Sequence, residues 1–239
     1  MQKTLNATQL SEFYINVFVD DQVRDFKSFF SDVNNPISGT GIDIGGGVGY
    51  FASTVKSDLA HVVRVIEIDP VSVQYCKNSG LEAEIGDAIN YVPKGDEVVV
   101  CFNLILHHLV ANSEKKTKSL QASALRTWKS KSRRLFVNEY IYESYIPNIS
   151  GWLIYQITSS LVLSAIGKMV SKIIPSFRAN TFGTGVRFRS HDEWKKFFTD
   201  EGFQVTKSII GVNEPVALPR RMLLIKNIRR DSFLLESVN

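Results

Sequence analysis

From residue 41 onward, short apolar runs alternate with amphipathic stretches, and this alternation constrains the fold more than any other feature. The predicted strands are GIDIGG (41–46), HVVRVIEID (61–69), LEAEIGD (81–87), EVVVCFN (97–103) and RRLFVNEYI (133–141). Helical patterns separate them at 50–59, 70–79 and 113–131. Strands that alternate with helices form βαβ units, which build a parallel sheet covered on both faces. With two closing strands expected at 203–212 and 221–228, the sequence predicts a doubly wound α/β fold with a seven-stranded, mostly parallel sheet.

Other segments stand outside this alternation. Apolar spacing near 3.6 over residues 6–33 predicts helices, so residues 1–38 are expected to form an N-terminal helical segment. Residues 144–182 interrupt the pattern with an apolar insertion, which we interpret as a helical lid. The run SHDEWKKFFTDEGF predicts an amphipathic helix ended by Gly202, and the tail RRDSFLLESVN is expected to be peripheral. The 239 residues fit a single domain, 1–239.

Composition bears on compartment and partners. The net charge of +4 is spread along the chain without a basic, aromatic-interleaved tract, so no nucleic-acid partner is expected. The two cysteines form no CxxC or Cys/His cluster, so neither a disulfide framework nor a metal site is expected, and a reducing, cytoplasmic compartment is the default. Residues 144–167 lack charges but contain Pro147 and many polar residues, so no membrane span is expected. The oligomeric state stays open.

The segment GIDIGGGVG (41–49) carries the strongest chemical signal. An apolar strand leads into a turn with Gly45, Gly46, Gly47 and Gly49, and glycine lets the backbone approach a ligand without a Cβ clash. In an open parallel sheet, ligands bind beyond the carboxyl ends of the strands. A tight turn without a ligand is the alternative. A dinucleotide also stays possible, because Ala52 is allowed at the last position of the GxGxxG pattern.

Three carboxylates follow strand ends near this turn. Asp43 would repel a pyrophosphate but suits the ammonium group of an amino-acid moiety, directly or through water. Asp69 lies where an acidic side chain accepts hydrogen bonds from ribose hydroxyls, although it can also cap the helix that starts at Pro70. Asp87, followed by Ala88, offers a carboxylate near an adenine amino group. Three acidic strand ends with one glycine turn form a much more specific signal than any one of them alone.

The motifs IDIGGGVG, IEIDP, IGDA, CFNLILHHL, LFVNEYI and RFRSHDEWKKFFTDEGF occur in that order over residues 41–203. In this order and spacing the chain resembles class I S-adenosylmethionine (SAM)-dependent methyltransferases. More narrowly, it is similar to the catalytic domain of plant-type small-molecule O-methyltransferases. The resemblance implies a Rossmann-like methyltransferase fold with SAM as the cofactor. The implied cofactor-binding residues are Asp43, Gly45, Gly46, Gly47, Gly49, Asp69, Asp87, Ala88 and Asn103.

The resemblance also implies catalytic residues. His107 falls where the family carries its general base, and Glu139 falls where a glutamate orients that histidine. Arg189 and Ser190 match a short Arg-Thr element before the amphipathic helix. The chain departs from the family at His108, which replaces an aspartate and is a second candidate base, and at Phe188, which replaces a second orienting glutamate. The family's N-terminal dimerisation domain has no match ahead of the glycine turn.

The expected activity is methyl transfer to a small molecule, with an oxygen nucleophile and His107 as base. Several alternatives stay open: an N-methyltransferase or nucleic-acid methyltransferase of the same fold, a non-catalytic partner protein, and a nicotinamide oxidoreductase. The place of the Asn/Asp-Pro-Pro-aromatic element of amino-directed enzymes reads Phe102-Asn103-Leu-Ile, without proline. The apolar insertion favours a partly apolar acceptor. Aromatic residues at its start line either the acceptor pocket or the lid's own packing: Tyr140, Tyr142, Tyr145, Trp152 and Tyr155.

Overall fold

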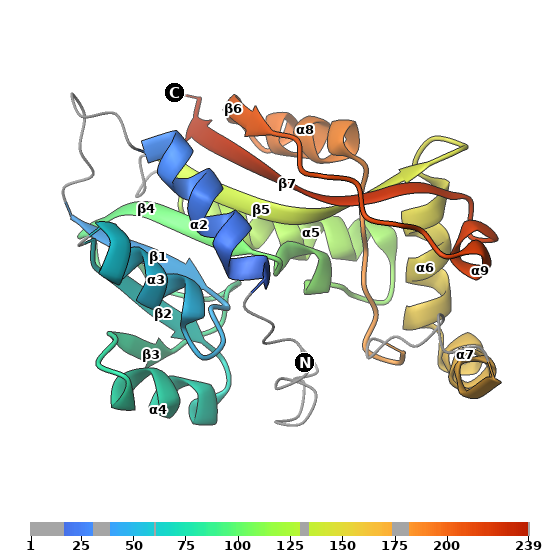
Figure 1. The fold of residues 1–239 in the computed structure, drawn as a ribbon, viewed down its shortest axis with the longest axis horizontal. Helices are drawn as coiled ribbons and strands as arrows, with labels where there is room; N and C mark the ends of the chain where they lie inside the picture. The colour runs from blue at the N-terminus through green and yellow to red at the C-terminus, as the bar shows by residue number, and fades with distance from the viewer. Residues whose placement is uncertain (1–16, 31–38, 60, 130–133, 174–181, 239) are drawn as a thin grey trace.

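The computed structural model describes residues 17–30, 39–59, 61–129, 134–173 and 182–238. Within them, seven strands form one sheet in the order β3-β2-β1-β4-β5-β7-β6 (Figure 1). The strands are β1 (Thr40–Ile44), β2 (Val63–Glu67), β3 (Ala83–Ile85), β4 (Glu97–Asn103), β5 (Arg134–Ser144), β6 (Phe203–Ile209) and β7 (Ile225–Ser237). The first five pair in parallel, and β7 runs antiparallel to β5 and β6. The predicted doubly wound, mostly parallel sheet is confirmed.

Helices cover both faces of this sheet, as the alternating pattern predicts (Figure 1). One face carries α2 (Val17–Phe30), α3 (Tyr50–Leu59) and α4 (Pro70–Asn78), whose apolar side chains join one buried cluster with the strands. The opposite face carries α5 (Glu114–Arg126) and α8 (His191–Asp200) in a second cluster. Strands buried on both faces read as continuous apolar runs, which is why VRVIE and EVVVCFN were recognisable in the sequence.

The C-terminal segment does not follow the prediction. A strand was expected at 221–228 with a peripheral tail, but β7 starts at Ile225 and continues to Ser237 between β5 and β6. Its residues Phe233 and Leu235 are fully buried. The charged residues that precede them suggest a surface segment, and for this reason the prediction of a peripheral tail is wrong. In the structure Arg229 Nε donates to buried Asp231 Oδ1 at 2.9 Å, and the two charges neutralise each other inside the protein. Their charge therefore does not mark a surface segment.

The insertion after β5 is helical, as predicted. It contains α6 (Ile149–Ser159) and α7 (Leu161–Ile173), and residues 174–181 lie outside the described residues. The axes of α6 and α7 are bent by 97° at Ser160, and no single described helix is long and apolar enough to cross a membrane. Of the N-terminal helical segment, residues 1–16 and 31–38 also lie outside the described residues. A short 3-10 turn, η1 (Leu106–His108), and the helix α9 (Leu218–Arg221) complete the fold.

Candidate active site

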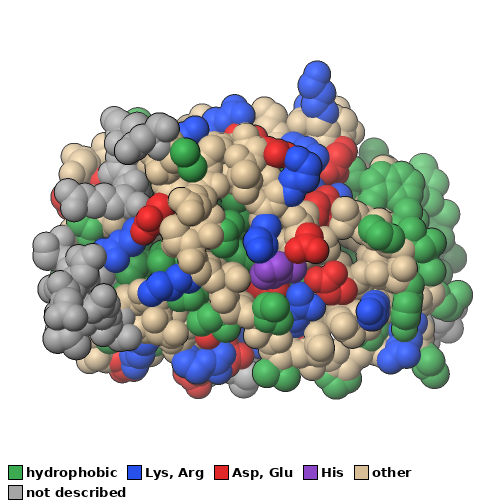
Figure 2. Space-filling model, turned by 90° about the horizontal axis from the view of Figure 1, so that it is seen from above, with side chains coloured by type: hydrophobic (Ala, Val, Ile, Leu, Met, Phe, Trp, Pro, Cys, Tyr) green, Lys and Arg blue, Asp and Glu red, His purple; other side chains and the backbone are tan. Residues whose placement is uncertain are grey.

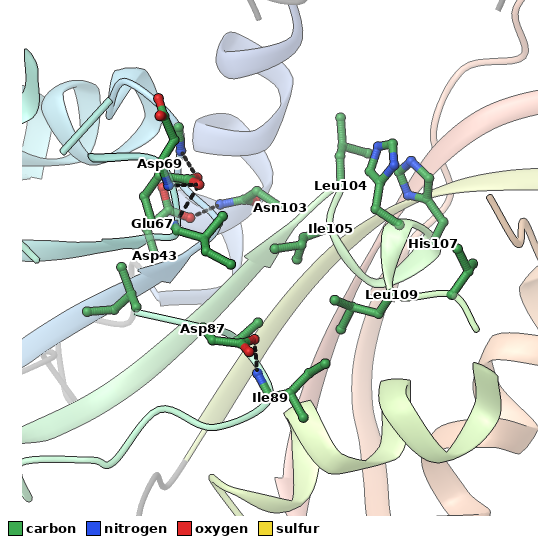
Figure 3. A pocket seen from close by; sticks show the side chains of 18 of the residues that line it. Asp43, Glu67, Asp69, Asp87, Ile89, Asn103, Leu104, Ile105, His107 and Leu109 are labelled. Atoms are coloured by element: carbon green, nitrogen blue, oxygen red, sulfur yellow. Dashed lines mark hydrogen bonds between the residues drawn. The ribbon is translucent and has the colours of Figure 1, made fainter. Parts of the chain in front are cut away.

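A cavity of about 920 Å³ opens at the carboxyl edge of the parallel strands. One half is lined by the turn after β1 and by the ends of β2, β3 and β4. The other half is lined by η1 and the loop after it, by Tyr140 of β5, by Ser159 of α6, and by Thr184 and Gly185 after α7. Figure 3 shows the two halves facing each other, with Asp43, Glu67, Asp69 and Asp87 on one side and His107 on the other.

The turn after β1 brings backbone directly to the cavity wall. Gly47 lines the cavity with a φ of 55°, a region that L side chains seldom occupy. A Cβ on Gly46 would lie 2.5 Å from Asp43 Oδ2, so a side chain there would displace that carboxylate. The helix α3 begins at Tyr50, immediately after Gly49, and the free N–H groups of its first turn point to this side. The turn therefore has room for a ligand held against bare backbone.

Asp43 is buried at the end of β1 beneath this turn. Its Oδ1 accepts a 2.9 Å hydrogen bond from Asn103 Nδ2, while within the described part of the chain its buried Oδ2 has no partner. Burial raises the pKa of Asp43 to about 7; the Asn103 hydrogen bond lowers it and the charge of Glu67 raises it further. A buried carboxylate with an unpaired acceptor is costly unless a donor reaches it. A ligand ammonium group would supply such a donor.

Glu67 and Asp69 occupy different positions at the end of β2. The carboxylate of Asp69 caps α4, accepting from Ser72 N at 2.9 Å and Ser72 Oγ at 2.7 Å. Although desolvation opposes it, these bonds hold the pKa of Asp69 below its ordinary value. Glu67 Oε2 instead crosses to the glycine turn and accepts from Gly47 N at 3.0 Å. In Figure 3 the carboxylate of Glu67 lies toward Asn103, whereas that of Asp69 points away.

The loop after β3 supplies the floor of the same half. Asp87 Oδ1 accepts from Ile89 N at 2.9 Å, and its Oδ2 accepts from Asn90 Nδ2 at 3.2 Å. Ala88, between them, is buried and lines the cavity. The carboxylate orders its own loop, and the residues of this loop that line the cavity are Gly86, Asp87, Ala88, Ile89 and Asn90.

The opposite half holds a buried histidine–carboxylate pair. His107 Nδ1 lies 2.6 Å from Glu139 Oε2, and Glu139 Oε1 accepts from Leu106 N at 2.6 Å. The side chains come together because η1 follows β4 and β4 pairs with β5, with Asn103 opposite Asn138. Glu139 does not end its strand as predicted. It lies within β5, which continues to Ser144 because β7 pairs along its whole outer length.

Aromatic rings surround this pair. The ring of Phe188 stacks on His107 with centroids 4.9 Å apart, at the place where the family that the sequence resembles has a glutamate. The centroid of His108 lies 4.2 Å from that of His107, and burial together with the neighbouring imidazole keeps the pKa of His108 well below its ordinary value. Burial also raises the pKa of Tyr140 to about 12, so this phenol stays protonated.

The remaining aromatic candidates divide clearly. Of the five, Tyr140 lines the cavity. Tyr155 Oη donates to Ala111 O at 2.7 Å and so ties α6 to the loop after η1. Tyr142 stacks on Phe188, and Tyr145 and Trp152 are exposed. Four of these residues therefore serve packing or surface, and one faces the cavity.

A buried polar chain behind η1 was not predicted. Arg189 Nη2 donates to Gln121 Oε1 at 2.7 Å, and Gln121 Nε2 donates to Leu106 O at 2.9 Å. Because the N–H of Leu106 also donates to Glu139, both the N–H and the carbonyl of Leu106 are hydrogen-bonded to side chains. Ser190 caps α8 by accepting from Glu193 N at 3.2 Å. A glutamine on the apolar face of the helix 113–131 was the available signal for this chain.

The charges of the lining separate the two halves. Every acidic residue that lines the cavity lies in the half with the glycine turn, and no Lys or Arg of the described residues lines either half. Around the histidines the lining is mainly apolar, with Leu104, Ile105, Leu109, Val110 and Leu120. The site therefore suits a cationic ligand next to a neutral, partly apolar one.

No protein-family model matches the sequence. A search of curated proteins also gave no match. Solved structures are similar in fold. Magnesium protoporphyrin IX methyltransferase (ChlM) from Synechocystis PCC 6803 with bound SAH is 14% identical with a TM-score of 0.57, over 99% of this chain and 90% of that one.

Two further neighbours differ in activity. The mitomycin 7-O-methyltransferase MmcR is 16% identical with a TM-score of 0.54, over 93% of this chain and 54% of that one. The [4+2]-cyclase SpnF is 11% identical with a TM-score of 0.60, over 92% of this chain and 81% of that one. At these identities the likeness concerns the fold, which is that of SAM-dependent methyltransferases.

Proposed function

We propose that this protein binds SAM in the acidic half of the cavity and methylates a hydroxyl group of a small, partly apolar molecule in the other half. One observation carries the proposal: a single cavity joins the glycine turn and its carboxylates to the His107–Glu139 pair. Either feature alone has a structural explanation. Their meeting in one space, on this fold, favours a reaction between two ligands.

The acidic half fits the parts of SAM. The unpaired oxygen of buried Asp43 would accept from the ammonium group of the methionine moiety. Glu67, whose carboxylate reaches the turn, would accept from the ribose hydroxyls, with Asp69 as the less favoured candidate. Asp87 and Ala88 would flank the adenine. When bound, SAM supplies a methyl group already activated on a sulfonium sulfur.

His107 would remove the proton of the acceptor hydroxyl. The carboxylate of Glu139 would hold a proton on Nδ1, which would fix the tautomer and leave Nε2 as the basic nitrogen. Phe188 and His108 pack against the ring and hold its plane. The apolar lining excludes charged acceptors, since an unpaired charge there would be strongly disfavoured. The buried carboxylate of Asp43 beneath the turn would repel a pyrophosphate, which weakens the nicotinamide alternative.

Calorimetry tests the cofactor. The wild type should bind SAM and S-adenosylhomocysteine but not NAD, and Gly47→Val should lose this binding. Gly80→Val is the matched control, because Gly80 also has a positive φ but lies outside the cavity lining with open space around it. Failure of the wild type to bind either SAM or S-adenosylhomocysteine would contradict the proposal.

Methyl transfer to a panel of apolar phenols and alcohols tests the chemistry. His107→Ala should lower turnover by about 10² or more, the usual scale for a general base, with SAM affinity nearly unchanged. At saturating SAM, the dependence of the wild-type rate on pH should be absent in His107→Ala. His108→Ala should keep this dependence, because its depressed pKa leaves that ring neutral. A variant without His107 that kept both rate and pH profile would rule out this base.

A further inference from the structure

The outward face of α7 is apolar and exposed. The helix contacts the rest of the protein through buried Ser164 and through Gly167, where a Cβ would lie 2.4 Å from the ring of Phe182. Six apolar side chains of the helix are between 36% and 79% exposed: Leu161, Val162, Leu163, Ile166, Met169 and Val170. At 100° per residue five of them cover an arc opposite Ser164, whereas Leu161 lies on the same side of the helix as Ser164. We call this arc the α7 face.

Charge around the α7 face is of one sign. Lys172 lies at the edge of the face, about 80° around the helix from Ser164, whereas Lys168 lies about 40° from Ser164, on the side turned toward Gly183. No Asp or Glu occurs in the sequence between Glu143 and Asp192. Long lysine side chains can lay their methylene groups along apolar surface while the ammonium group reaches a polar layer. The surface thus combines an apolar strip with a cationic flank.

The same end of the molecule carries further exposed apolar residues. Figure 2 shows hydrophobic side chains gathered at the end where Figure 1 places α6, α7 and α9. They include Leu218 and Met222, each 79% exposed, and Trp152 of α6. Arg221 adds a basic residue at this end. Scattered exposed apolar residues are ordinary, but a gathered patch marks an interaction surface.

We propose that the α7 face docks on the surface of a lipid bilayer that contains anionic lipids. An amphipathic helix with an apolar face and lysines beside it lies in the interface plane, where its cations meet negative headgroups. Tryptophan is favoured at the same depth. A second copy of the chain suits the face less well, because residues 144–191 contain no acidic residue that could pair with Lys172 when the same surface meets itself in a two-fold dimer. The inference does not depend on the methyl-transfer proposal.

Packing of α6 fixes how α7 would lie. Tyr155, Ser150 and Gly151 of α6 are buried against the body of the protein, and Tyr155 is bonded to Ala111. The helix α7 leaves α6 at 97°, so it runs across the end of the molecule. Its 13 residues correspond to about 20 Å of helix that can rest on a surface without any change in the sheet.

Vesicle flotation with the full-length protein tests this proposal. The probes are vesicles of phosphatidylcholine alone and of phosphatidylcholine mixed with phosphatidylglycerol. The wild type should float with the mixed vesicles and far less with the neutral ones. Ile166→Glu combined with Met169→Glu should reduce the bound fraction by at least about tenfold. Tyr75→Glu on α4 is the matched control, since Tyr75 is 50% exposed and Ile166 53% exposed, both on helices.

Three outcomes would overturn the inference. The wild type could stay unbound with both vesicle types, or the double variant could float as well as the wild type. In the third, ultracentrifugation would show that the wild type is a dimer and Ile166→Glu a monomer, while neither protein binds vesicles. The α7 face would then be a contact between copies of the chain. Circular dichroism and thermal melting of each variant identify any loss of folding. The single variant Met169→Lys removes an apolar side chain without adding a negative charge, so it separates loss of apolar contact from repulsion by anionic lipids.

Discussion

Glu67 and Asp69 stand two residues apart at the end of β2, yet their carboxylates have different partners. Glu67→Gln should weaken SAM binding by at least about tenfold, since a charge-assisted hydrogen bond is worth about 1.5–3 kcal/mol. Asp69→Ala should instead destabilise the protein by about 1 kcal/mol through loss of a helix cap, with a smaller effect on affinity. Calorimetry and urea unfolding of both variants measure the two effects. The reverse pattern would assign the ribose to Asp69.

Spacing alone cannot separate these two residues. The motif IEIDP contains two carboxylates near the end of one strand, and Asp69 was favoured because it lies 20 positions after Gly49. The sequence also suggested that Asp69 caps a helix, and the structure confirms this cap. What the sequence does not encode locally is the rotamer that carries Glu67 across to Gly47 N, because that contact depends on β1 and β2 lying side by side.

Asp43 should make SAM binding depend on pH. Its pKa of about 7 means that the ligand-free protein holds a proton there below neutrality, whereas an ammonium group requires the carboxylate. Binding near pH 6 should therefore release a proton, and affinity should rise toward about pH 8. Calorimetry in buffers of different ionisation enthalpy detects that proton. In Asp43→Asn the release should vanish and affinity should fall at all pH values; unchanged proton release would exclude Asp43 as its source.

The same residue affects stability without ligand. The unfolded chain releases the proton of Asp43 near the ordinary pKa of 3.8, and the folded protein releases it near a pKa of about 7. Between these values the folded state binds more protons, so this contribution to stability is present at low pH and lost as pH rises through about 7. The Asp43→Asn variant has no carboxyl group at this position, so it does not lose this contribution as pH rises. Its free energy of unfolding relative to that of the wild type should therefore increase with pH, which urea unfolding at several pH values measures.

At the scale of elements, η1 depends on three neighbours. β5 holds its Leu106 N–H through Glu139, and α5 holds its Leu106 carbonyl through Gln121, which Arg189 fixes from the segment before α8. Gln121→Met should leave SAM affinity and KM for the acceptor nearly unchanged while lowering kcat by about tenfold, since a misplaced base loses alignment. Gln74→Met on the exposed face of α4 is the control. An unchanged kcat and pH profile in Gln121→Met would make this chain purely structural.

The elements differ in how far sequence predicted them. β4 has the predicted bounds 97–103 and α3 has 50–59, because each is a short apolar or amphipathic run with turn residues at both ends. β7 was cut short, since Arg229, Arg230 and Asp231 interrupt its apolar pattern. Arg229 forms ion pairs with Asp231 and Glu143, and Arg230 forms one with Glu214. These pairs with Glu143 and Glu214 depend on the tertiary structure and cannot be read from the local sequence. Strand length in the antiparallel β5–β7 ribbon follows from pairing, which no local pattern specifies.

At the scale of the whole molecule, the cavity is assembled from segments that are distant in sequence. Its lining extends from Val19 of α2 to Gly185 after α7, and includes four strand ends between them. The sequence predicted which strand ends carry polar residues, because parallel strands present their carboxyl ends at one edge. It could not predict that α2 and the segment after α7 close the sides, since both depend on how separate elements pack across that edge.

This assembly predicts a large effect of ligand on global stability. Because the lining segments meet only in the native topology, S-adenosylhomocysteine should bind the folded chain and not the unfolded one. At about 100 times its Kd it should add about 2.7 kcal/mol, which for a chain of this length corresponds to a rise in Tm on the order of 5–10 °C. Thermal melts should show this rise for the wild type and Gly80→Val, but not for Gly47→Val or with NAD. Equal shifts with NAD would point to a dinucleotide site. Calorimetry could detect binding of S-adenosylhomocysteine while the Tm stays unchanged. In that case the ligand also binds the unfolded chain, or the cavity wall opens without unfolding of the sheet.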